Sequence, residues 1–349
     1  MQILRLTLEN LRAIDSVELD LSTADGRPRR RTVILAANGF GKTTTLDAIA
    51  HIYGQFDERL GARSVTAADL RRTSTPQPGP GEVSPTGLVE IEANLVFEER
   101  QSIRAYFPDV PEHGPLRREI GSMPARDRSF TAQALLDSLA SSESVRDDTF
   151  TAPVRAALLE SRGAPCVYLV ADRGTLAAPA DVSAPELADF DPKVDCLAPG
   201  RARFRTLAAR LALAYVSPRD NDRDGLVKRL WAVLAQYLPN MPRPVGVRGL
   251  TLLFDNQRRA QVGLSELSDG ERAVLLLLGE IALRNPEHGV VLIDELEQHL
   301  HPRWQRDILD ALVALAPTAQ FIITTQSVSL AASAEDDLVK IGDWDEYGA

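Results

Sequence analysis

The chain opens with a period-two alternation of apolar and polar residues. Apolar side chains recur through residues 3–8 and again through residues 17–21. Because alternate side chains of a strand lie on opposite faces, this pattern predicts two strands of a hairpin or meander. A continuous apolar run from 33 to 37 then predicts a buried strand, and helical spacing over 43–53 predicts a helix. The chain therefore begins with two strands, followed by a strand, a glycine-containing loop and a helix.

Alternating helix and strand patterns continue toward the end of the chain. Strands are predicted over 88–97, 166–173, 290–294 and 320–325, helices over 201–216, 226–238, 270–283 and after Pro302, and a hairpin over 250–264 that turns at Asp255 and Asn256. Residues 100–163 are expected to be mostly helical pieces, and 73–87 and 174–200 to be loops. No sustained heptads occur, so long coiled-coil arms are not expected.

The stretch LAANGFGKTTTLDAI lies between the predicted buried strand and its helix. A phosphate loop needs converging backbone N–H groups, a lysine for the β/γ-phosphates and a hydroxyl for Mg²⁺. Gly39 and Gly41 permit the tight turn, Lys42 supplies the amine, and Thr43 supplies the hydroxyl at the start of the helix. Ala36 replaces the usual first glycine, which is tolerable if its φ is negative. The alternative interpretation is a turn that binds no ligand.

Two downstream segments carry matching chemistry. VVLIDELEQHL places Asp294 and Glu295 at the carboxyl end of a buried strand, where ligands of open α/β sheets bind. Asp294 would hold Mg²⁺ through water and Glu295 would polarise the attacking water, unless this is an ordinary acidic strand end. In LSELSDGERAVLLLL, residues 268–271 predict a helix N-terminus that presents N–H groups and a hydroxyl. Ser268 or Asp269 could equally be a simple N-cap.

These segments resemble the Walker A, signature and Walker B motifs of the RecF/SMC/OLD branch of ABC-type AAA ATPases, in the order of that family. The chain is most similar to stand-alone virulence-associated ATP-binding proteins and PtuA-type ATPases of anti-phage systems. LIDELEQHLHPRWQRDILDAL, QFIITTQS and LTLENLRAIDSVELDL carry this resemblance, and residues 54–200 are not fixed by it. It implies an α/β P-loop NTPase: an ABC-ATPase-like two-lobed head with a mixed sheet, a helical insertion and no long coiled-coil arms.

The same resemblance implies a domain plan. We expect residues 1–100 to form an N-terminal ATPase lobe with Walker A, and 101–165 a mainly helical insertion. Residues 166–349 would form the C-terminal ATPase lobe with signature, Walker B and switch. Only a short tail follows FIITTQS, so the C-terminal Toprim nuclease of OLD proteins is not expected.

The family pattern also implies the ligands, ATP and Mg²⁺, and the residues that hold them. Nucleotide binding is expected of Asn38, Gly39, Phe40, Gly41, Lys42, Thr43, Thr44 and Arg12, with Ser268 and Gly270 reaching the ATP of a second subunit; catalysis of Glu295, Lys42 and Gln326; and metal binding of Thr43 and Asp294. Gln326 stands at the switch histidine of the family and cannot carry a positive charge, so slow hydrolysis is expected. The Q-loop glutamine has no counterpart, because its expected zone offers Asp172 and Arg173.

Charge and composition restrict the partners. The 349 residues carry a formal net charge of −10, so no global attraction to nucleic acid or an anionic membrane is expected. Basic clusters at 27–31 and 201–210 would contact DNA or RNA, or form a solvated turn and helix face. His299 and His301 suggest a metal site or a structured turn. The apolar runs are too short to span a bilayer and no signal peptide is evident, which favours a cytoplasmic protein without membrane contact.

Three functions follow from these features. The resemblance implies an ATPase that forms a homodimer around ATP and regulates a separate effector, a nuclease or toxin, in bacterial anti-phage defence. The second is a RecF-like DNA-repair ATPase that binds DNA on the same core. The third is a scaffold that binds ATP structurally and turns it over very little, which Gln326 and Ala36 keep open.

Overall fold

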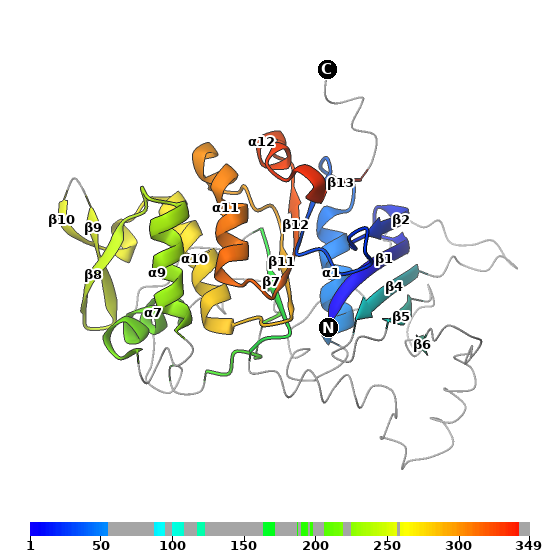
Figure 1. The fold of residues 1–349 in the computed structure, drawn as a ribbon, viewed down its shortest axis with the longest axis horizontal. Helices are drawn as coiled ribbons and strands as arrows, with labels where there is room; N and C mark the ends of the chain where they lie inside the picture. Colours follow the sequence, from blue (N-terminus) through cyan, green and yellow to red (C-terminus); the bar gives the residue numbers. More distant parts are fainter. Residues whose placement is uncertain are drawn as a thin grey trace, which may run out of the picture.

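The computed structural model describes residues 1–54, 87–94, 100–107, 117–122, 163–171, 187, 190–194, 196–197, 206–218, 225–256 and 259–341. Their strands form three sheets: a parallel sheet at the centre, an antiparallel sheet on one side of it, and a three-stranded sheet at the far end of the other side (Figure 1).

The parallel sheet carries the segments singled out from the sequence. Its strand order is β13 (Leu338–Lys340), β3 (Arg31–Leu35), β12 (Gln320–Thr325), β11 (Val290–Ile293) and β7 (Cys166–Leu169). Every residue of β7, β11 and β12 is buried, as expected for strands covered on both faces. Because β3, β12 and β11 are parallel neighbours, the loops that follow them lie at one edge of the sheet.

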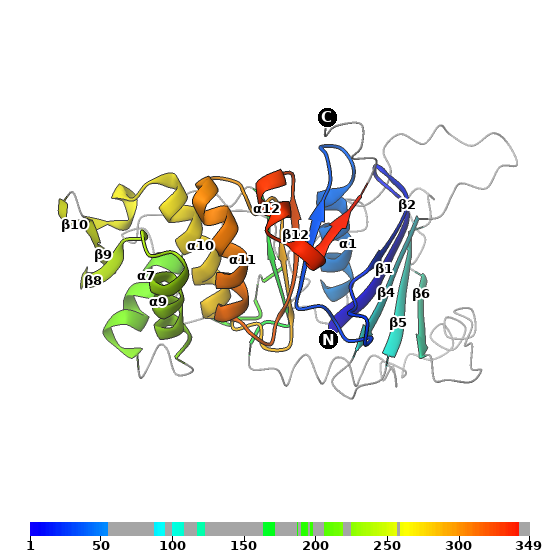
Figure 2. The ribbon, with the colours of Figure 1, turned by 45° about the horizontal axis from the view of Figure 1, so that its top comes forward.

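The predicted N-terminal hairpin is confirmed as part of the antiparallel sheet. Strands β1 (Gln2–Leu11) and β2 (Ile14–Asp20) pair antiparallel, and β1 also pairs with β4 (Gly87–Asn94). Helix α1 (Lys42–Gly54) lies between this sheet and the parallel one in both views, and most of its side chains are buried (Figures 1 and 2). The helix that follows the phosphate loop therefore lies between the hairpin and the parallel sheet, and Ile3 of β1 also bonds directly to the side chain of Gln320 in β12.

A group of helices covers the opposite face of the parallel sheet (Figure 2). These are α7 (Leu207–Val216), α9 (Leu226–Tyr237), α10 (Asp269–Arg284) and α11 (Pro302–Leu315). Beyond them lies the sheet of β8 (Arg243–Arg248), β9 (Thr251–Asn256) and β10 (Arg259–Gly263), and the 3-10 helix η3 (Leu264–Glu266) connects β10 to α10. Helix α12 (Val328–Ala332) and the 3-10 helix η4 (Glu335–Asp337) connect β12 to β13.

The predicted α/β P-loop fold is confirmed, and the described residues contain no long coiled coil. The hairpin over 250–264 is confirmed as β9 and β10, but its predicted turn is wrong, because Asp255 and Asn256 lie within β9 and pair with Arg243 and Arg259. Elements β8, α12 and β13 were not predicted. The helical expectation is wrong for two described stretches, because β5 (Arg100–Phe107) and β6 (Arg117–Ser122) extend the antiparallel sheet from β4. Residues 108–116 and 123–162 lie outside the described residues, as do residues 73–86 and most of 174–200, which were predicted as loops. The proposed domain boundaries stay predictions. Within the described ranges, no helix is both long and apolar enough to cross a bilayer.

Candidate functional site

The loop between β3 and α1 has the conformation that its glycines predict. Gly39 and Gly41 have φ of 86° and 85°, in the left-handed region that favours glycine. A Cβ on Gly41 would lie 2.4 Å from Cγ1 of Ile14, so the β1–β2 turn packs directly against this loop. Ala36 is buried and is not among the residues with positive φ, so its methyl group is accommodated without strain.

Lys42 is held inside the loop by neutral oxygens. Its Nζ donates to the carbonyl of Ala36 at 2.8 Å and to Oδ1 of Asn38 at 3.2 Å, and the residue is 5% exposed. Among the described residues, no acid forms an ion pair with this lysine. A buried ammonium group is expensive unless it is compensated, so the loop favours an anion beside Lys42.

The loop and the acid after β11 meet in space. Thr43 donates a hydrogen bond from Oγ1 to Oδ2 of Asp294 at 2.8 Å, across 251 residues of sequence. The other carboxylate oxygen of Asp294 accepts from Thr324 Oγ1 at 2.5 Å, and Asp294 is buried. The structure thus brings together the hydroxyl and the carboxylate that the sequence predicts as metal ligands. Thr44 is buried in the first turn of α1, and Phe40 is 38% exposed at the tip of the loop.

Arg12 contacts an acid of this protein that the sequence analysis missed. Its Nη1 donates to Oδ2 of Asp47 at 2.7 Å, and Tyr168 Oη donates to Oδ1 of the same carboxylate at 2.8 Å. Burial raises the pKa of Asp47, against the lowering effects of Tyr168 and Arg12. Burial, with the Asp47 carboxylate nearby, also raises the pKa of Tyr168 well above its ordinary value. An acid within the otherwise apolar stretch LDAIA was the signal available for Asp47.

Glu295 and Gln326 follow the neighbouring strands β11 and β12 at the same edge of the parallel sheet. Glu295 follows Asp294 with a φ of 45°, and its N–H donates to Thr324 Oγ1 at 3.0 Å. Gln326 directly follows β12 with an exposed side chain, and its N–H donates to Glu297 Oε1 at 2.7 Å. Thr324 and Glu297 were missed because their contacts become visible only once β11 and β12 are paired. Asp172 and Arg173 lie outside the described residues.

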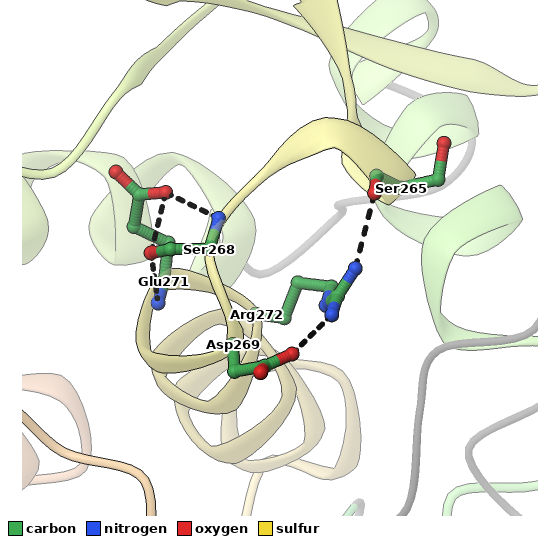
Figure 3. Close-up of polar contacts among 5 residues, drawn as sticks. All are labelled: Ser265, Ser268, Asp269, Glu271 and Arg272. Carbon is green, nitrogen blue, oxygen red and sulfur yellow. Dashed lines mark hydrogen bonds and ion pairs between the residues drawn. The ribbon is translucent and has the colours of Figure 1, made fainter.

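The signature segment is an N-capped helix start. Ser268 Oγ accepts from Glu271 N–H at 3.3 Å and donates to Glu271 Oε2 at 2.8 Å, while Ser268 N–H donates to the same carboxylate at 2.7 Å (Figure 3). Arg272 pairs with Asp269 and donates to the Ser265 carbonyl at 3.0 Å. A Cβ on Gly270 would lie 2.9 Å from the His299 carbonyl, so this glycine permits close approach of the helix start to residue 299. The predicted N-cap is therefore Ser268, whose hydroxyl is also one of the groups expected to reach a ligand.

The remaining candidates bond to other residues of this chain. His301 Nδ1 accepts from Arg303 N–H at 3.2 Å and caps α11, and the described ranges contain no cluster of three or more potential metal ligands. In the basic stretch 27–31, Arg31 pairs with Asp310 and Asp337, and Arg29 donates to the carbonyls of Ser22 and Asp336. In the second basic cluster, residues 201–205 lie outside the described residues, and Arg210 donates to Thr206 Oγ1 at 3.1 Å.

Comparison with known proteins identifies the family of the chain. Residues 105–332 match the family model "AAA domain, putative AbiEii toxin, Type IV TA system". The chain is 34% identical over 93 residues to the retron Vc95 probable ATPase of Vibrio cholerae serotype O1 biovar El Tor, covering 24% of this chain and 18% of that protein. It is 41% identical over 71 residues to Septu protein PtuA of Bacillus mycoides (strain KBAB4), covering 18% of this chain and 10% of that protein. These alignments therefore span only a small part of each relative.

A solved structure supports the fold over almost the whole chain. The structure titled "Crystal structure of the SmcHead bound to the C-winged helix domain of ScpA" superposes with a TM-score of 0.55 at 18% identity, covering 95% of this chain and 92% of that one. At this identity the likeness establishes the fold alone. The family match covers more than half of the chain, from residue 105 to residue 332. The chain thus belongs to the family described as "AAA domain, putative AbiEii toxin, Type IV TA system", and its fold is similar to that of the solved SMC head.

Proposed function

We propose that this protein binds and hydrolyses ATP at the edge of the parallel sheet where the loops after β3, β11 and β12 meet. The observation that carries the proposal is the 2.8 Å hydrogen bond between Thr43 and Asp294, which joins Walker A to Walker B. The buried amine of Lys42, held only by neutral oxygens among the described residues, supports an anionic ligand at the same place.

The residues at this edge fit Mg²⁺ bound together with the nucleotide. A hydroxyl from Thr43 and a carboxylate from Asp294 are hard oxygen ligands of the kind that Mg²⁺ prefers. Thr43 and Asp294 would hold the ion, which when bound neutralises charge on the phosphates. The left-handed turns at Gly39 and Gly41 would allow backbone N–H groups to approach the phosphates closely.

Each remaining residue has a specific task in this proposal. Lys42 would contact the β/γ-phosphates, and Glu295 would accept a proton from the attacking water as general base. Asn38, Phe40 and Thr44 would line the nucleotide, whereas Arg12 would reach it only after it exchanges Asp47 for the ligand. Gln326 would act as a hydrogen-bonding switch residue without a charge, which supports slow turnover.

We further propose that two copies dimerise around two ATP molecules. In this arrangement Ser268 and the backbone of Gly270 would contact the ATP bound by the other copy. The support is that Ser268 is exposed at the start of α10, where N–H groups and the helix dipole favour an anion. As the resemblance to PtuA-type ATPases implies, the dimer would control a separate effector, a nuclease or toxin, in anti-phage defence in the cytoplasm.

The scaffold alternative keeps one specific observation in its favour, the neutral Gln326 at the switch position. The DNA-repair alternative gains less from the structure, because Arg29 and Arg31 of the basic stretch bind groups of their own chain. Phosphate release by the purified protein separates an ATPase from a scaffold, and salt-dependent DNA binding would favour the repair reading.

The test compares wild type, Lys42→Ala and Glu295→Gln by ATP binding, phosphate release and mass in solution, with and without ATP and Mg²⁺. Loss of the general base should slow hydrolysis by about 10²–10⁴-fold and trap an ATP-bound dimer of Glu295→Gln. Lys42→Ala should remain without nucleotide and should not respond to ATP. A wild type that releases no phosphate contradicts the ATPase proposal, and a mass indifferent to nucleotide in all three contradicts the dimer.

A further inference from the structure

The turn after β11 is fastened to the end of β12. Glu295 has a φ of 45°, which non-glycine residues rarely adopt, so the turn needs external support. The Glu295 N–H donates to Thr324 Oγ1 at 3.0 Å, and the Leu296 N–H donates to the Thr324 carbonyl at 3.2 Å. The backbone that carries the proposed general base is thus held against the last residues of the neighbouring strand.

Glu297 continues this attachment to the segment after β12. Its Oε2 accepts from Thr325 Oγ1 at 2.7 Å, and its Oε1 accepts from the Gln326 N–H at 2.7 Å. Both oxygens of the carboxylate are therefore used, one on the last residue of β12 and one on the next residue of the chain. Hydrogen bonds to an ionised acceptor are about twice as strong as neutral ones, so this connection is a firm one.

Further side chains hold the same segment from the other side. Thr325 Oγ1 accepts from the Ser327 N–H at 2.9 Å, and Ser327 Oγ donates to Gln305 Oε1 of α11 at 2.8 Å. Thr325 is completely buried, whereas the side chain of Gln326 is exposed. The backbone on both sides of Gln326 is consequently fixed, while its amide group is left at the surface of the sheet edge.

We propose that Glu297 is a positioning residue for ATP hydrolysis, because it sets Gln326 relative to Glu295. This inference rests on the proposed ATPase function. A neutral amide contributes only through hydrogen bonds, which weaken steeply when their angle is poor, so Gln326 depends on its placement more than a charged group does. One carboxylate joins the turn that bears the base to the segment that bears the amide. Its loss would change their relative geometry while leaving the phosphate loop intact.

The test is a double-mutant cycle of Glu297→Gln and Gln326→Ala, read as kcat from single-turnover hydrolysis and as Kd for ATP in equilibrium binding. Glu297→Gln keeps the shape of the side chain but replaces one acceptor by a donor, which opposes either Thr325 or the Gln326 N–H. We expect kcat to fall on the order of ten- to a hundredfold, as for a small misplacement of a reacting group, with Kd for ATP unchanged. With Gln326→Ala already present, Glu297→Gln should have no further effect, because it acts through Gln326.

Two further variants guard against a trivial loss of folding. Thr325→Val removes the hydroxyl that links Glu297 to Ser327 at nearly constant volume, and should lower kcat in the same direction. Glu287→Gln makes the same chemical change at an exposed position outside the site and should hydrolyse ATP like wild type. Thermal unfolding of all variants shows whether a loss of rate is a loss of folded protein.

The outcomes separate this inference from the ATPase proposal. If wild type hydrolyses ATP but Gln326→Ala does so equally fast, the positioning role is overturned and the ATPase proposal stands. Additive losses in the double mutant, or a parallel change in Kd for ATP, would show that Glu297 supports the fold rather than Gln326. A wild type without phosphate release overturns both proposals together.

Discussion

The Walker A and Walker B residues and the signature residues are built in different ways. Lys42, Asp294 and Thr324 are buried, and the bond between Thr43 and Asp294 spans 251 residues of sequence. Ser268 is exposed, and its side chain bonds to a residue three positions along the chain. The first set is assembled by the tertiary fold, whereas the second is a helix cap whose bonds are local. Under the proposed function, the signature would acquire a role beyond capping when it lies against a second copy.

The largest expected effect comes from removing the buried charge of Lys42 among the Walker A and Walker B residues. Lys42→Ala should lower ATP hydrolysis by at least about 10²–10³-fold, the usual loss when one donor to a developing charge is removed. Affinity for ATP should fall with it, because the same amine would contact the bound phosphates. Equilibrium binding of labelled ATP and phosphate release measure the two effects.

Lys228→Ala, at an exposed position of α9, serves as the matched control for this lysine. It removes the same group from the helical layer and should leave binding and hydrolysis unchanged. If Lys42→Ala hydrolysed ATP at the wild-type rate, the buried amine would serve the fold alone. The structural difference between the Walker residues and the signature residues would then not reflect a difference in function.

Substitutions at two glycines of the phosphate loop measure how closely this loop packs against the hairpin. Gly39 and Gly41 have nearly the same positive φ, but a Cβ on Gly39 would meet nothing within 4 Å, whereas one on Gly41 would lie 2.4 Å from Ile14. Gly39→Ala should lower the free energy of unfolding by about 1–2 kcal/mol through backbone strain alone. Gly41→Ala should lower the free energy of unfolding by about a further 1–3 kcal/mol, because the extra methyl group also overpacks the contact with the hairpin. Urea unfolding without nucleotide measures both, and equal losses would contradict the predicted packing.

The sequence predicted the residues whose spacing defines a motif, and missed those defined by remote contacts. Lys42, Thr43 and Asp294 follow from their positions relative to a buried strand, and the structure places Thr43 beside Asp294. The attachment of Glu297 to Thr325 needs β11 and β12 to be paired in a particular register, which no local pattern contains. The cause of each miss is therefore distance along the chain rather than unusual chemistry.

Secondary structure shows the same limit. Strands β3, β11 and β12 contain runs of three or four consecutive apolar residues and were predicted, because strands buried on both faces contain such runs. The stretches 100–107 and 117–122 are strands only because each pairs with a neighbour in the antiparallel sheet. Their own composition favours no single element, so the helical expectation failed where tertiary pairing decided the outcome.

Ser268→Ala, in the signature segment, should have a smaller effect on stability and activity than the substitutions in the phosphate loop. Loss of the cap should lower the free energy of unfolding by about 0.5–2 kcal/mol. Under the proposed function it should also weaken ATP-dependent dimerisation, while ATP binding to the loop of the same copy is retained. Ser265→Ala is the control, because Ser265 contributes its backbone carbonyl, not its hydroxyl, to the bond with Arg272 (Figure 3). If Ser268→Ala abolished ATP binding by a single copy, the Walker residues and the signature residues would not be separable.

The smallest expected effect is a pH dependence of stability that arises from the buried carboxyl group of Asp47. Burial raises the pKa of Asp47 above its ordinary value of 3.8, so the folded protein holds this proton more tightly than the unfolded chain does. A raised pKa stabilises the fold at low pH, and that stabilisation is lost as the pH rises through the folded-state value. Asp47→Asn removes this term together with the bond from Arg12. The difference in unfolding free energy between variant and wild type should therefore change with pH in the mildly acidic range just above 3.8, by at most about 1.4 kcal/mol per pH unit.

Urea unfolding at a series of pH values isolates this difference, because the other acids are common to both proteins. Tyr168→Phe provides the matched test, since the Tyr168 hydroxyl bonds to the Asp47 carboxylate and lowers its pKa. Without that hydroxyl the pKa of Asp47 should rise further, and the pH window should extend upward. If Asp47→Asn instead ran parallel to wild type at every pH, Asp47 would titrate alike in the folded and unfolded chains. The bonds from Arg12 and Tyr168 would then balance the effect of burial, and the carboxylate behind the phosphate loop would exact no electrostatic penalty.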